Sequence, residues 1–506
     1  MRGSNLAQLR YNPIDLQGQP VAGAQLQIVH LQNKGGRLIP PDDSGHTRLV
    51  WPKPVVTDKD GRFLIRGIGG GAIITLRAEH ERCAPERLEL TAGETKTFVL
   101  APARLLEGRV VYADTDKPAP HVEVGAWGVR GETDENGRFH LNPARGPIGA
   151  GEETGLILAY APKDEPYLNV QKEFHWPKAA VPTAEVKHCV DLALPRGILV
   201  RGRVTEKDSG KPVADALVFY QAQFINPNAK REEAGANNFA IGRNAVTSRS
   251  DGTFQIACLP GAGYLTIEGP GPDYVLGENG GYDQMFYGKH GGQPWLSHGF
   301  AAVDLQLGAK PPKIAVALRK GVTLQAIVNG PAGQPVGDLQ VFCRLQGFAA
   351  SPVQVRGSRL ELHGCDAEKI LRAMVFDPKN QWGATVEMSM QNAGKMPMRI
   401  RLAPCGSVRV RFLDAEGNPL AGFYPGLFLE LMPKHGDLRA HTLQVISPFD
   451  KSGSHTDEKG WCILTTLIPE ATYQFGHEEI ETTFRVKAGE TLNLGELRIK
   501  AFKPSP

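Results

Sequence analysis

The sequence predicts an all-β chain, built as a tandem array of about five antiparallel β-sandwich modules. The first observation is composition, because 58 Gly and 38 Pro in 506 residues exceed average usage and indicate many turns rather than long helices. The other two observations are a pair of short motifs that recur along the chain. A chain of this length exceeds what one hydrophobic core organises, so roughly three to five domains are expected.

The first motif is a proline turn that leads into a strand. It reads GQPVAGA at 18–24, GKPVADA at 210–216, GQPVGDL at 333–339 and GNPLAG at 417–422, with a weaker KPAPHV at 117–122. The motif prolines stand roughly 84 to 123 residues apart, which is the size of one sandwich domain. Before the turn, residues 200–204 and 408–412 alternate apolar and polar side chains, which indicates a strand with one buried face.

The second motif predicts a hairpin. It reads TDKDGRF at 57–63, TDENGRF at 133–139, SRSDGTF at 248–254 and TDEKGW at 456–461, with a degenerate RGSRL at 356–360. Each full copy sets Asp or Asn near a Gly that can take positive φ, and an aromatic residue then starts a strand. We expect Trp461 to fill the aromatic position and to lie in the core. Residues 366–373 are expected to form one or two helical turns.

The two motifs together predict the domain boundaries. They fall at 5–102, 103–195, 196–319, 320–404 and 405–502. The third module carries a long insertion at 269–303, rich in Gly and aromatic residues, and the fourth module is degenerate. Short connectors at 101–103, 195–197 and 404–406 predict little freedom between neighbours.

The pattern as a whole resembles one known family. A strand, the Gly-x-Pro-Val turn, the Thr-Asp-x-x-Gly-x-Phe motif and the LPGAGY turn at 259–264 are similar to the carboxypeptidase regulatory-like domain, a prealbumin-like or Ig-like sandwich. The resemblance covers nearly the whole chain, in tandem copies like those of large planctomycete-type bacterial proteins. It implies architecture more than activity, because the family appends this module to peptidases, transporters, adhesins and surface proteins. It also implies an extracytoplasmic or cell-surface location.

Sequence motifs of catalysis are missing. The chain has no Gly-x-Ser-x-Gly elbow, no Walker loop, no His-Glu-x-x-His helix and no Cys-x-x-Cys pair. One His-x-x-Glu pair, His455 and Glu458, falls in the fifth copy of the second motif, where turn chemistry is favoured over zinc. The resemblance supplies no catalytic residue either. We therefore predict a non-enzymatic protein without a cofactor.

Calcium is a sharper alternative for the second motif. The Asp-x-Asp-Gly at 58–61 and the Asp-x-Asn-Gly at 134–137 mimic the opening of a calcium loop. The Glu expected about six residues after the Gly is replaced by Gly67 and Pro143, so a plain turn without metal is favoured.

Charge, cysteine content and hydropathy bound the partners. The 57 Lys and Arg are interleaved with 54 Asp and Glu, so nucleic acid is not expected as a partner. Seven scattered cysteines are interpreted as buried thiols, with Cys258 and Cys365 at equivalent core positions. We find neither a secretory-signal core nor an apolar run of roughly 20 residues, so no membrane span is expected. The early start of the first strand motif is consistent with the accessory part of a larger protein.

The insertion at 269–303 is the best candidate for a functional surface, because loops of this length usually carry function or disorder. The ligand-surface candidates are aromatic or imidazole side chains in Gly- and Pro-rich loops, namely Trp295, Tyr287, Tyr282, His290 and Trp51. The alternative is a lid that packs on its own sandwich and buries its aromatic residues. Two functions stay open: a spacer, scaffold or binding surface, and a carbohydrate-binding array. The partner is accordingly a protein or polysaccharide surface.

Overall fold

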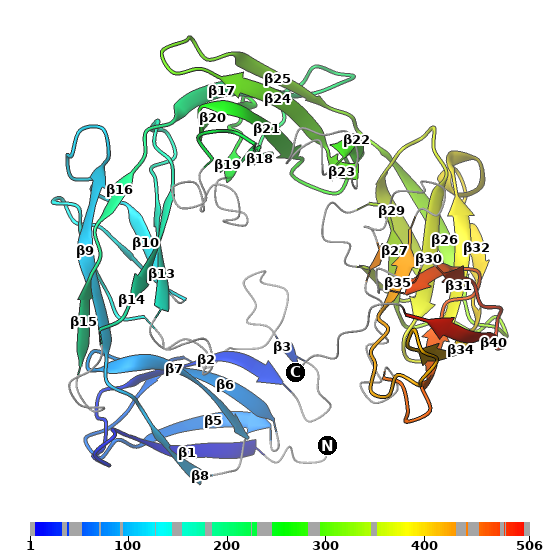
Figure 1. Cartoon of the computed structure of the whole chain (residues 1–506), viewed down its shortest axis with the longest axis horizontal. Coiled ribbons are helices and arrows are strands. Elements are labelled where there is room, and N and C mark those ends of the chain that lie inside the picture. Colours follow the sequence, from blue (N-terminus) through cyan, green and yellow to red (C-terminus); the bar gives the residue numbers. More distant parts are fainter. Residues whose placement is uncertain are drawn as a thin grey trace. The chain divides into compact units, whose positions relative to one another are not determined.

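The chain is all-β and forms tandem β-sandwiches (Figure 1). The computed structural model describes residues 6–32, 38–39, 53–69, 72–91, 95–126, 128–143, 154–177, 185–223, 225–229, 245–281, 294–345, 352–431, 442–443, 455–475, 480 and 482–499. The chain divides into two compact units, formed mainly by residues 1–199 and by residues 200–506.

The first two sandwiches each combine two sheets. One sheet of the first contains β1 (Leu6–Ile14), β5 (Phe63–Gly69) and β8 (Thr95–Val99), and the other contains β2 (Gln25–Gln32), β3 (Leu38–Ile39), β4 (Val55–Val56), β6 (Ile73–His80) and β7 (Cys83–Thr91). One sheet of the second contains β9 (Arg104–Tyr112), β12 (Arg138–Leu141), β15 (Val186–Cys189) and β16 (Leu192–Leu194), and the other contains β10 (Glu123–Ala126), β11 (Val129–Glu132), β13 (Thr154–Tyr160) and β14 (Val170–His175).

The remaining sandwiches follow the same plan. In the third, β17 (Ile198–Glu206), β20 (Thr253–Cys258) and β25 (Lys313–Leu318) face β18 (Leu217–Ala222), β19 (Ala245–Thr247), β21 (Gly261–Glu268) and β24 (Gly299–Leu305), while β22 (Gly277–Gly281) and β23 (Pro294–Ser297) pair within the insertion. In the fourth, β26 (Val322–Asn329), β29 (Arg359–Cys365) and β32 (Met398–Arg401) face β27 (Asp338–Cys343), β28 (Val353–Arg356), β30 (Leu371–Asp377), β31 (Trp382–Met388) and β33 (Ala403–Pro404). In the fifth, β34 (Gly406–Leu413), β37 (Trp461–Leu467) and β40 (Thr491–Arg498) face β35 (Leu427–Glu430), β36 (Thr442–Leu443), β38 (Thr472–Phe475) and β39 (Thr483–Phe484).

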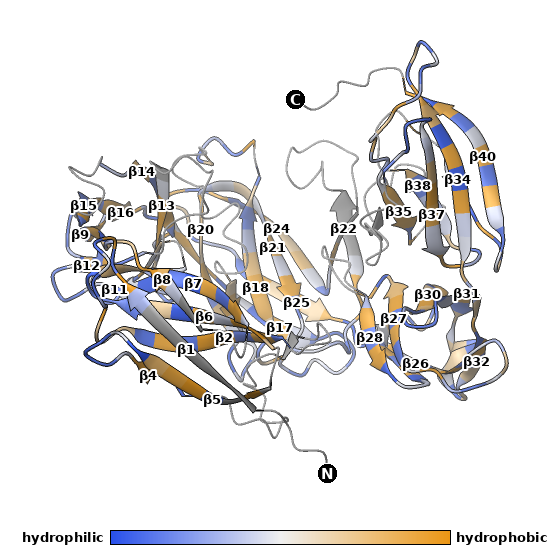
Figure 2. Ribbon diagram, turned by 90° about the horizontal axis from the view of Figure 1, so that it is seen from below, coloured by the Kyte–Doolittle hydropathy of each residue, from blue (hydrophilic) through white to orange (hydrophobic). Residues whose placement is uncertain are grey.

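The core of each sandwich lies between its two sheets, because alternate residues of each strand point inward. In the second sandwich, Leu106 and Val110 of β9 join Val124 of β10 and Ile157 of β13 in one buried cluster. The predicted alternation at 408–412 is confirmed, since Val408, Val410 and Phe412 are fully buried. The same alternation is visible along β34 and β40 in Figure 2.

The sequence predicts antiparallel sandwiches, but each sandwich also contains parallel strand pairing. In four sandwiches the first strand pairs in parallel with the last: β1 with β8, β9 with β15 and β16, β17 with β25, and β34 with β40. In the fourth, β26 pairs in parallel with β32, which is followed only by the two-residue β33 of the other sheet. All other described strand pairs in the sheets named above are antiparallel. Alternation of side chains does not distinguish the two pairings, so sequence pattern could not reveal this.

The second motif is an arch between the two sheets, and the predicted hairpin is wrong. In the second sandwich, β11 precedes the motif and pairs with β10, whereas β12 follows the motif and pairs with β9 of the opposite sheet. The same division holds for β4 and β5, for β19 and β20, and for β28 and β29. An arch and a hairpin need the same turn residues, which explains the error.

A buried hydroxyl ties the arch to the proline turn. Thr133 Oγ1 donates to the carbonyl of Ala119 (2.7 Å) and accepts the N–H of Val122 (2.9 Å). Thr57 and Ser248 make the same two bonds in the first and third sandwiches, and Thr456 makes them in the fifth. We call this pair of bonds the hydroxyl staple. It explains why the two motifs recur together, since each supplies half of one interlocked corner.

Two further local predictions are wrong. Residues 366–370 form a turn and 371–377 form β30, so no helical turn occupies 366–373; the helical element nearby is the π-helix η1 (Met390–Gly394). Trp461 is only partly buried, with the guanidinium carbon of Arg409 3.9 Å from its ring centroid, and Cys462 takes the core position. The core side chain follows the motif Gly by two residues and Trp461 follows it by one, which places it on the opposite face.

The fourth and fifth sandwiches share buried residues through β30. Ala373 and Val375 belong to the core of the fourth sandwich, whereas Met374 and Phe376 on the other face belong to the core of the fifth. Phe342 of β27 also joins the fifth core. A sheet buried on both faces gives a continuous apolar run, and the Ala-Met-Val-Phe sequence at 373–376 is such a run.

Candidate functional site

The predicted ligand surface falls almost wholly outside the described residues. Trp51, Tyr282, Tyr287 and His290 all lie outside the described residues. Trp295 lies in β23, whose backbone pairs with β22, but its side chain is outside the description. The aromatic platform therefore remains a prediction.

The described beginning of the insertion is packed on its own sandwich. Tyr274 is only 8% exposed, and its ring centroid lies 6.0 Å from that of His298. His298 Nδ1 accepts the N–H of Gly269 at 2.9 Å. Burial lowers the pKa of His298, which keeps the imidazole neutral and able to accept this bond.

The same segment also holds the connector to the fourth sandwich. Val275 N–H donates to the carbonyl of Arg319 (2.9 Å), and Gly321 N–H donates to the carbonyl of Asp273 (2.7 Å). Tyr274 and Lys320 form an antiparallel bridge between these two bonds. Residues 272–275 thus add a short strand to connector 319–321, which joins β25 to β26.

Charged side chains complete this junction. Arg319 binds Asp366 through two bonds, Nη1 to Oδ1 at 3.0 Å and Nη2 to Oδ2 at 2.5 Å, and the Asp366 side chain is only 9% exposed. The Arg319 guanidinium holds the pKa of Asp366 below its usual range. His363 Nδ1 lies 3.0 Å from Thr323 Oγ1 and 3.6 Å from Asp273 Oδ1. We call residues 272–275, 319–323 and 363–366 together the junction clamp.

Glycine is required at one point of the junction clamp. Gly364 has φ +70, and a Cβ built there would lie 2.3 Å from the Pro272 carbonyl oxygen and 2.6 Å from that of Tyr274. The backbones of the insertion and of the fourth sandwich are therefore in direct contact. Sequence reasoning missed the junction clamp because contacts between residues this far apart leave no local periodicity.

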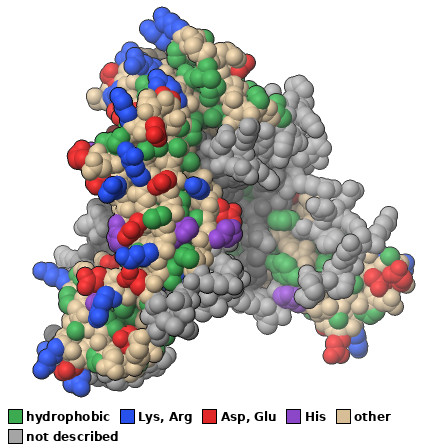
Figure 3. All heavy atoms as spheres, turned by 60° about the vertical axis from the view of Figure 1, so that its left-hand side comes forward, with side chains coloured by type: hydrophobic (Ala, Val, Ile, Leu, Met, Phe, Trp, Pro, Cys, Tyr) green, Lys and Arg blue, Asp and Glu red, His purple; other side chains and the backbone are tan. Residues whose placement is uncertain are grey.

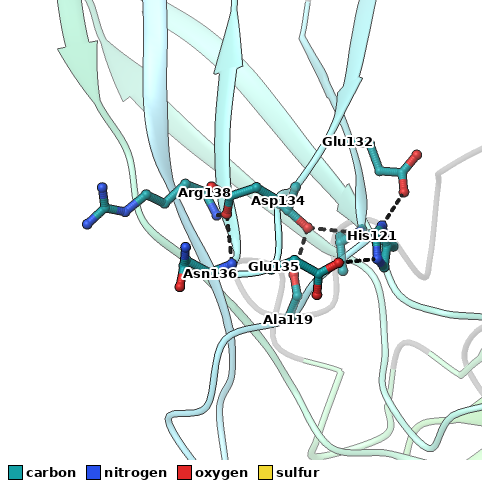
Figure 4. A network of polar contacts seen from close by, with 9 residues as sticks. Ala119, His121, Glu132, Asp134, Glu135, Asn136 and Arg138 are labelled. Carbon is teal, nitrogen blue, oxygen red and sulfur yellow. Dashed lines mark hydrogen bonds and ion pairs between the residues drawn. The ribbon is translucent and has the colours of Figure 1, made fainter.

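A second polar cluster lies at the corner of the second sandwich (Figure 4). His121 Nδ1 lies 2.9 Å from Glu132 Oε1, and His121 Nε2 lies 3.1 Å from Glu135 Oε1. The hydrogen bond to Glu132 and the charge of Glu135 raise the pKa of His121. Both ring nitrogens face carboxylates, so His121 in its protonated form donates to both and bridges the proline turn and the arch.

The motif carboxylates serve the turn. Asp134 Oδ1 accepts the N–H of Asn136 (2.9 Å) and of Arg138 (2.8 Å), and Asp58 and Asp457 accept the equivalent bonds. His455 lies with its ring centroid 5.4 Å from that of Tyr424. Among the described residues, no three His, Cys, Asp or Glu side chains gather in a way that could hold a metal ion.

An open groove of about 640 Å³ lies where the first two sandwiches meet. Asn142 Nδ2 donates to the carbonyls of Cys83 (2.8 Å) and His80 (3.3 Å), and the same side chain lines the groove with Glu79 and Glu81. The first two sandwiches are thus also in direct contact through hydrogen bonds.

The cysteines are mostly buried, as predicted, with two exceptions. Burial raises the pKa of Cys343 to about 12 and of Cys365 to about 11, which keeps both thiols protonated and unreactive. Cys258 is fully buried. Cys189 is exposed and Cys405 is partly exposed, because they stand at strand ends where one face meets solvent.

On the face shown in Figure 3, the basic and acidic side chains of the described residues are interspersed. The sequence composition agrees with this mixture. In the part of the chain that is described, no helix is both long and apolar enough to cross a membrane.

Comparison with known proteins gives an architectural likeness. No family model and no curated protein matches the chain. Among solved structures, the Bacillus anthracis TIE protein is 10% identical and covers 79% of this chain and 75% of its own, with a TM-score of 0.18. BcpA, the major pilin subunit of Bacillus cereus, is 12% identical over 63% of this chain and 100% of its own, with a TM-score of 0.16. The shaft pilin SpaA from Lactobacillus rhamnosus GG is 11% identical over 39% of this chain and 99% of its own, with a TM-score of 0.17.

Proposed function

We propose that this chain is a non-catalytic structural protein, a spacer or scaffold array that holds binding surfaces at fixed separations. The observation that supports this proposal is the junction clamp, in which part of the long insertion of the third sandwich pairs with the connector to the fourth sandwich and holds it in place. A linker that only tethers two domains needs no such contacts, because exposed Pro- and Gly-rich segments suffice. The shared core of the fourth and fifth sandwiches has the same effect.

The finer assignments belong to this proposal. Module boundaries at 5–102, 103–195, 196–319, 320–404 and 405–502 and membership of the carboxypeptidase regulatory-like family are supported by the two recurring motifs. The five hydrogen-bonded bridges at the motif prolines, from Pro20 to Pro419, support the repeat. We also propose a cell-surface location and a protein or polysaccharide partner, on the resemblance alone.

The spacing between the third and fourth sandwiches tests the proposal. Spin labels are attached to cysteines introduced at the exposed positions Leu307 and Ile370, with the accessible Cys189 and Cys405 replaced by Ser, and pulsed electron paramagnetic resonance reports the distance between them. We expect one narrow distance distribution in the unaltered junction and a broad one after Asp366→Ala. Arg359→Ala is the matched control, because it removes an exposed ion pair with Glu361 within the fourth sandwich and should leave the distribution narrow. A broad distribution before any substitution at the junction contradicts a rigid spacer.

Carbohydrate binding is the second candidate, favoured by the concentration of aromatic residues between 274 and 295. Binding of the full chain to a panel of soluble and insoluble polysaccharides tests it, with Trp295→Ala as the altered variant. Saturable binding that this variant loses supports a carbohydrate-binding array. Absence of binding to every glycan leaves the spacer.

A further inference from the structure

The terminal strands of the sandwiches point to a mechanical role. In the described part of the chain, the first strand of each of the five sandwiches forms a parallel ladder with the strand or strands that close the same sheet near the end of the sandwich. We propose that each ladder is a shear clamp, and that the chain bears tension applied between its two ends. This inference rests on the proposed spacer function and adds the load that the spacer carries.

The direction of the strands decides how tension acts. The chain enters the first strand at one end of the ladder and leaves the parallel last strand at the opposite end. Pulling on the two ends therefore slides one strand along the other, and every rung of the ladder is loaded at the same time. An antiparallel hairpin pulled at its open end instead loses its rungs one after another. Because the bonds of a parallel ladder are evenly spaced, the load is also shared evenly.

The connectors place the ladders in series with almost no slack. Residues 100–103 join β8 to β9, residues 195–197 join β16 to β17, and residues 319–321 join β25 to β26. The last strand of one ladder thus passes its load directly into the first strand of the next. A fully extended connector of three residues spans only about 10 Å.

Side chains reinforce the ladders on both faces. In the second sandwich, Val110 of β9 and Leu192 of β16 are paired and buried in the core, and Arg109 N–H donates to Asp191 Oδ1 at 2.9 Å. In the fifth, the Arg411 side chain binds Glu496 across the ladder at 2.7 Å. Sliding either ladder therefore breaks core contacts and side-chain bonds as well as backbone bonds.

The ladders differ in length, which gives an order of failure. The ladder of β26 and β32 has four paired positions, from Ala326 to Asn329. The ladder of β17 and β25 has six, from Arg201 to Glu206. The first strand of the second sandwich, β9, pairs over four positions with β15 and over three with β16, so the β26–β32 ladder has the fewest paired positions of any first strand and is expected to fail first.

Single-molecule force spectroscopy on the full chain tests the inference. In the first geometry the handles are at the two termini, and in the second they are at Thr115 and Arg196, which lie at the same end of the β9–β16 ladder and peel it apart. We expect a severalfold higher unfolding force for the second sandwich in the first geometry. Every full-module event in the first geometry, with a gain of about 300 Å or more from roughly 85 residues or more at ~3.3–3.6 Å each, should therefore exceed the force of the single event in the second geometry. Equal forces in the two geometries overturn the inference.

Two variants sharpen the test. Asp191→Ala removes a bond that crosses the terminal ladder and should lower the force of the second sandwich, whereas Arg130→Ala removes an exposed ion pair with Glu123 outside the ladder and should not. Equal effects of both variants also overturn the inference. A high shear force together with a broad distance distribution at the junction clamp would reject the rigid spacer but retain the load-bearing sandwiches, so the two proposals fail separately.

Discussion

The shared core of the fourth and fifth sandwiches makes a prediction about a single side chain. Phe376 is 3% exposed and packs in the core of the fifth sandwich, although its strand belongs to the fourth. Phe376→Ala removes a buried ring and leaves a cavity, which lowers the free energy of unfolding by about 3–5 kcal/mol. We expect the fifth sandwich to bear this loss. Val375→Ala is the matched control, because the neighbouring side chain points into the fourth core and loses only about 2 kcal/mol.

Hydrogen exchange resolved by peptide separates the two cores, which global unfolding of a multi-domain chain cannot do. Phe376→Ala should speed exchange of β38 amides by about a hundredfold or more, from the loss of at least ~3 kcal/mol. Val375→Ala should speed exchange in β26 and leave β38 protected. Unchanged protection of β38 in the Phe376 variant would refute the shared core and return β30 to the fourth sandwich alone.

Three further predictions concern the corners and their charges. Gly252→Ala should destabilise the third sandwich by about 1–3 kcal/mol more than Gly210→Ala, because both have positive φ but only the Gly252 Cβ would meet the Val204 carbonyl oxygen, at 2.4 Å. Hydrogen exchange of the β20 amides in both variants checks the difference, and equal acceleration contradicts it. Thr133→Val leaves the Ala119 carbonyl and the Val122 N–H without their buried partner, so the free energy of unfolding of the second sandwich should fall by about 1–3 kcal/mol per group. Faster hydrogen exchange of the β10 and β12 amides measures this loss. Unchanged exchange would mean that the hydroxyl staple adds no stability. The pKa of His121 is raised in the folded chain, so the stability that its protonation adds is complete below the unfolded pKa of about 6.5 and is lost as pH rises through the folded pKa. NMR titration of His121 should show a midpoint above 6.5, and Glu132→Gln should lower that midpoint. A midpoint at or below 6.5 in the unaltered chain would reject the bridged imidazolium.

The repeat and the fold class could be predicted because both depend on turns that require particular residue types at particular positions in the sequence. The Asp–Gly turn and the proline turn each need particular residue types at fixed spacing, and the hydroxyl staple links them, so both motifs survive wherever the corner does. The sheet to which a strand belongs was not predictable in the same way. An inward-facing residue alternates identically in a parallel terminal strand, in an arch and in a hairpin.

The candidate site was less accessible to sequence reasoning, for two physical reasons. Tyr274 falls within the aromatic insertion at 269–303 that the sequence predicts as a functional surface, but its contact with Lys320 depends on a connector that carries no aromatic or periodic signal. The double burial of β30 did leave a signal, since Met374 and Phe376 break the polar alternation expected of a strand with one wet face. Reading that run as a strand buried on both faces would have identified the shared core.

The fourth sandwich separates what the corner requires from what the ladder requires. Its second motif is reduced to RGSRL, and Ser358 Oγ accepts the Val336 N–H at 3.1 Å in place of the full staple. The arch nevertheless still links the two sheets, and β26 still pairs in parallel with β32. The parallel terminal ladder therefore persists where the turn chemistry has degenerated. A module selected to bear load between the two chain ends should keep its terminal ladder even when its turn residues change, and the fourth sandwich shows this combination.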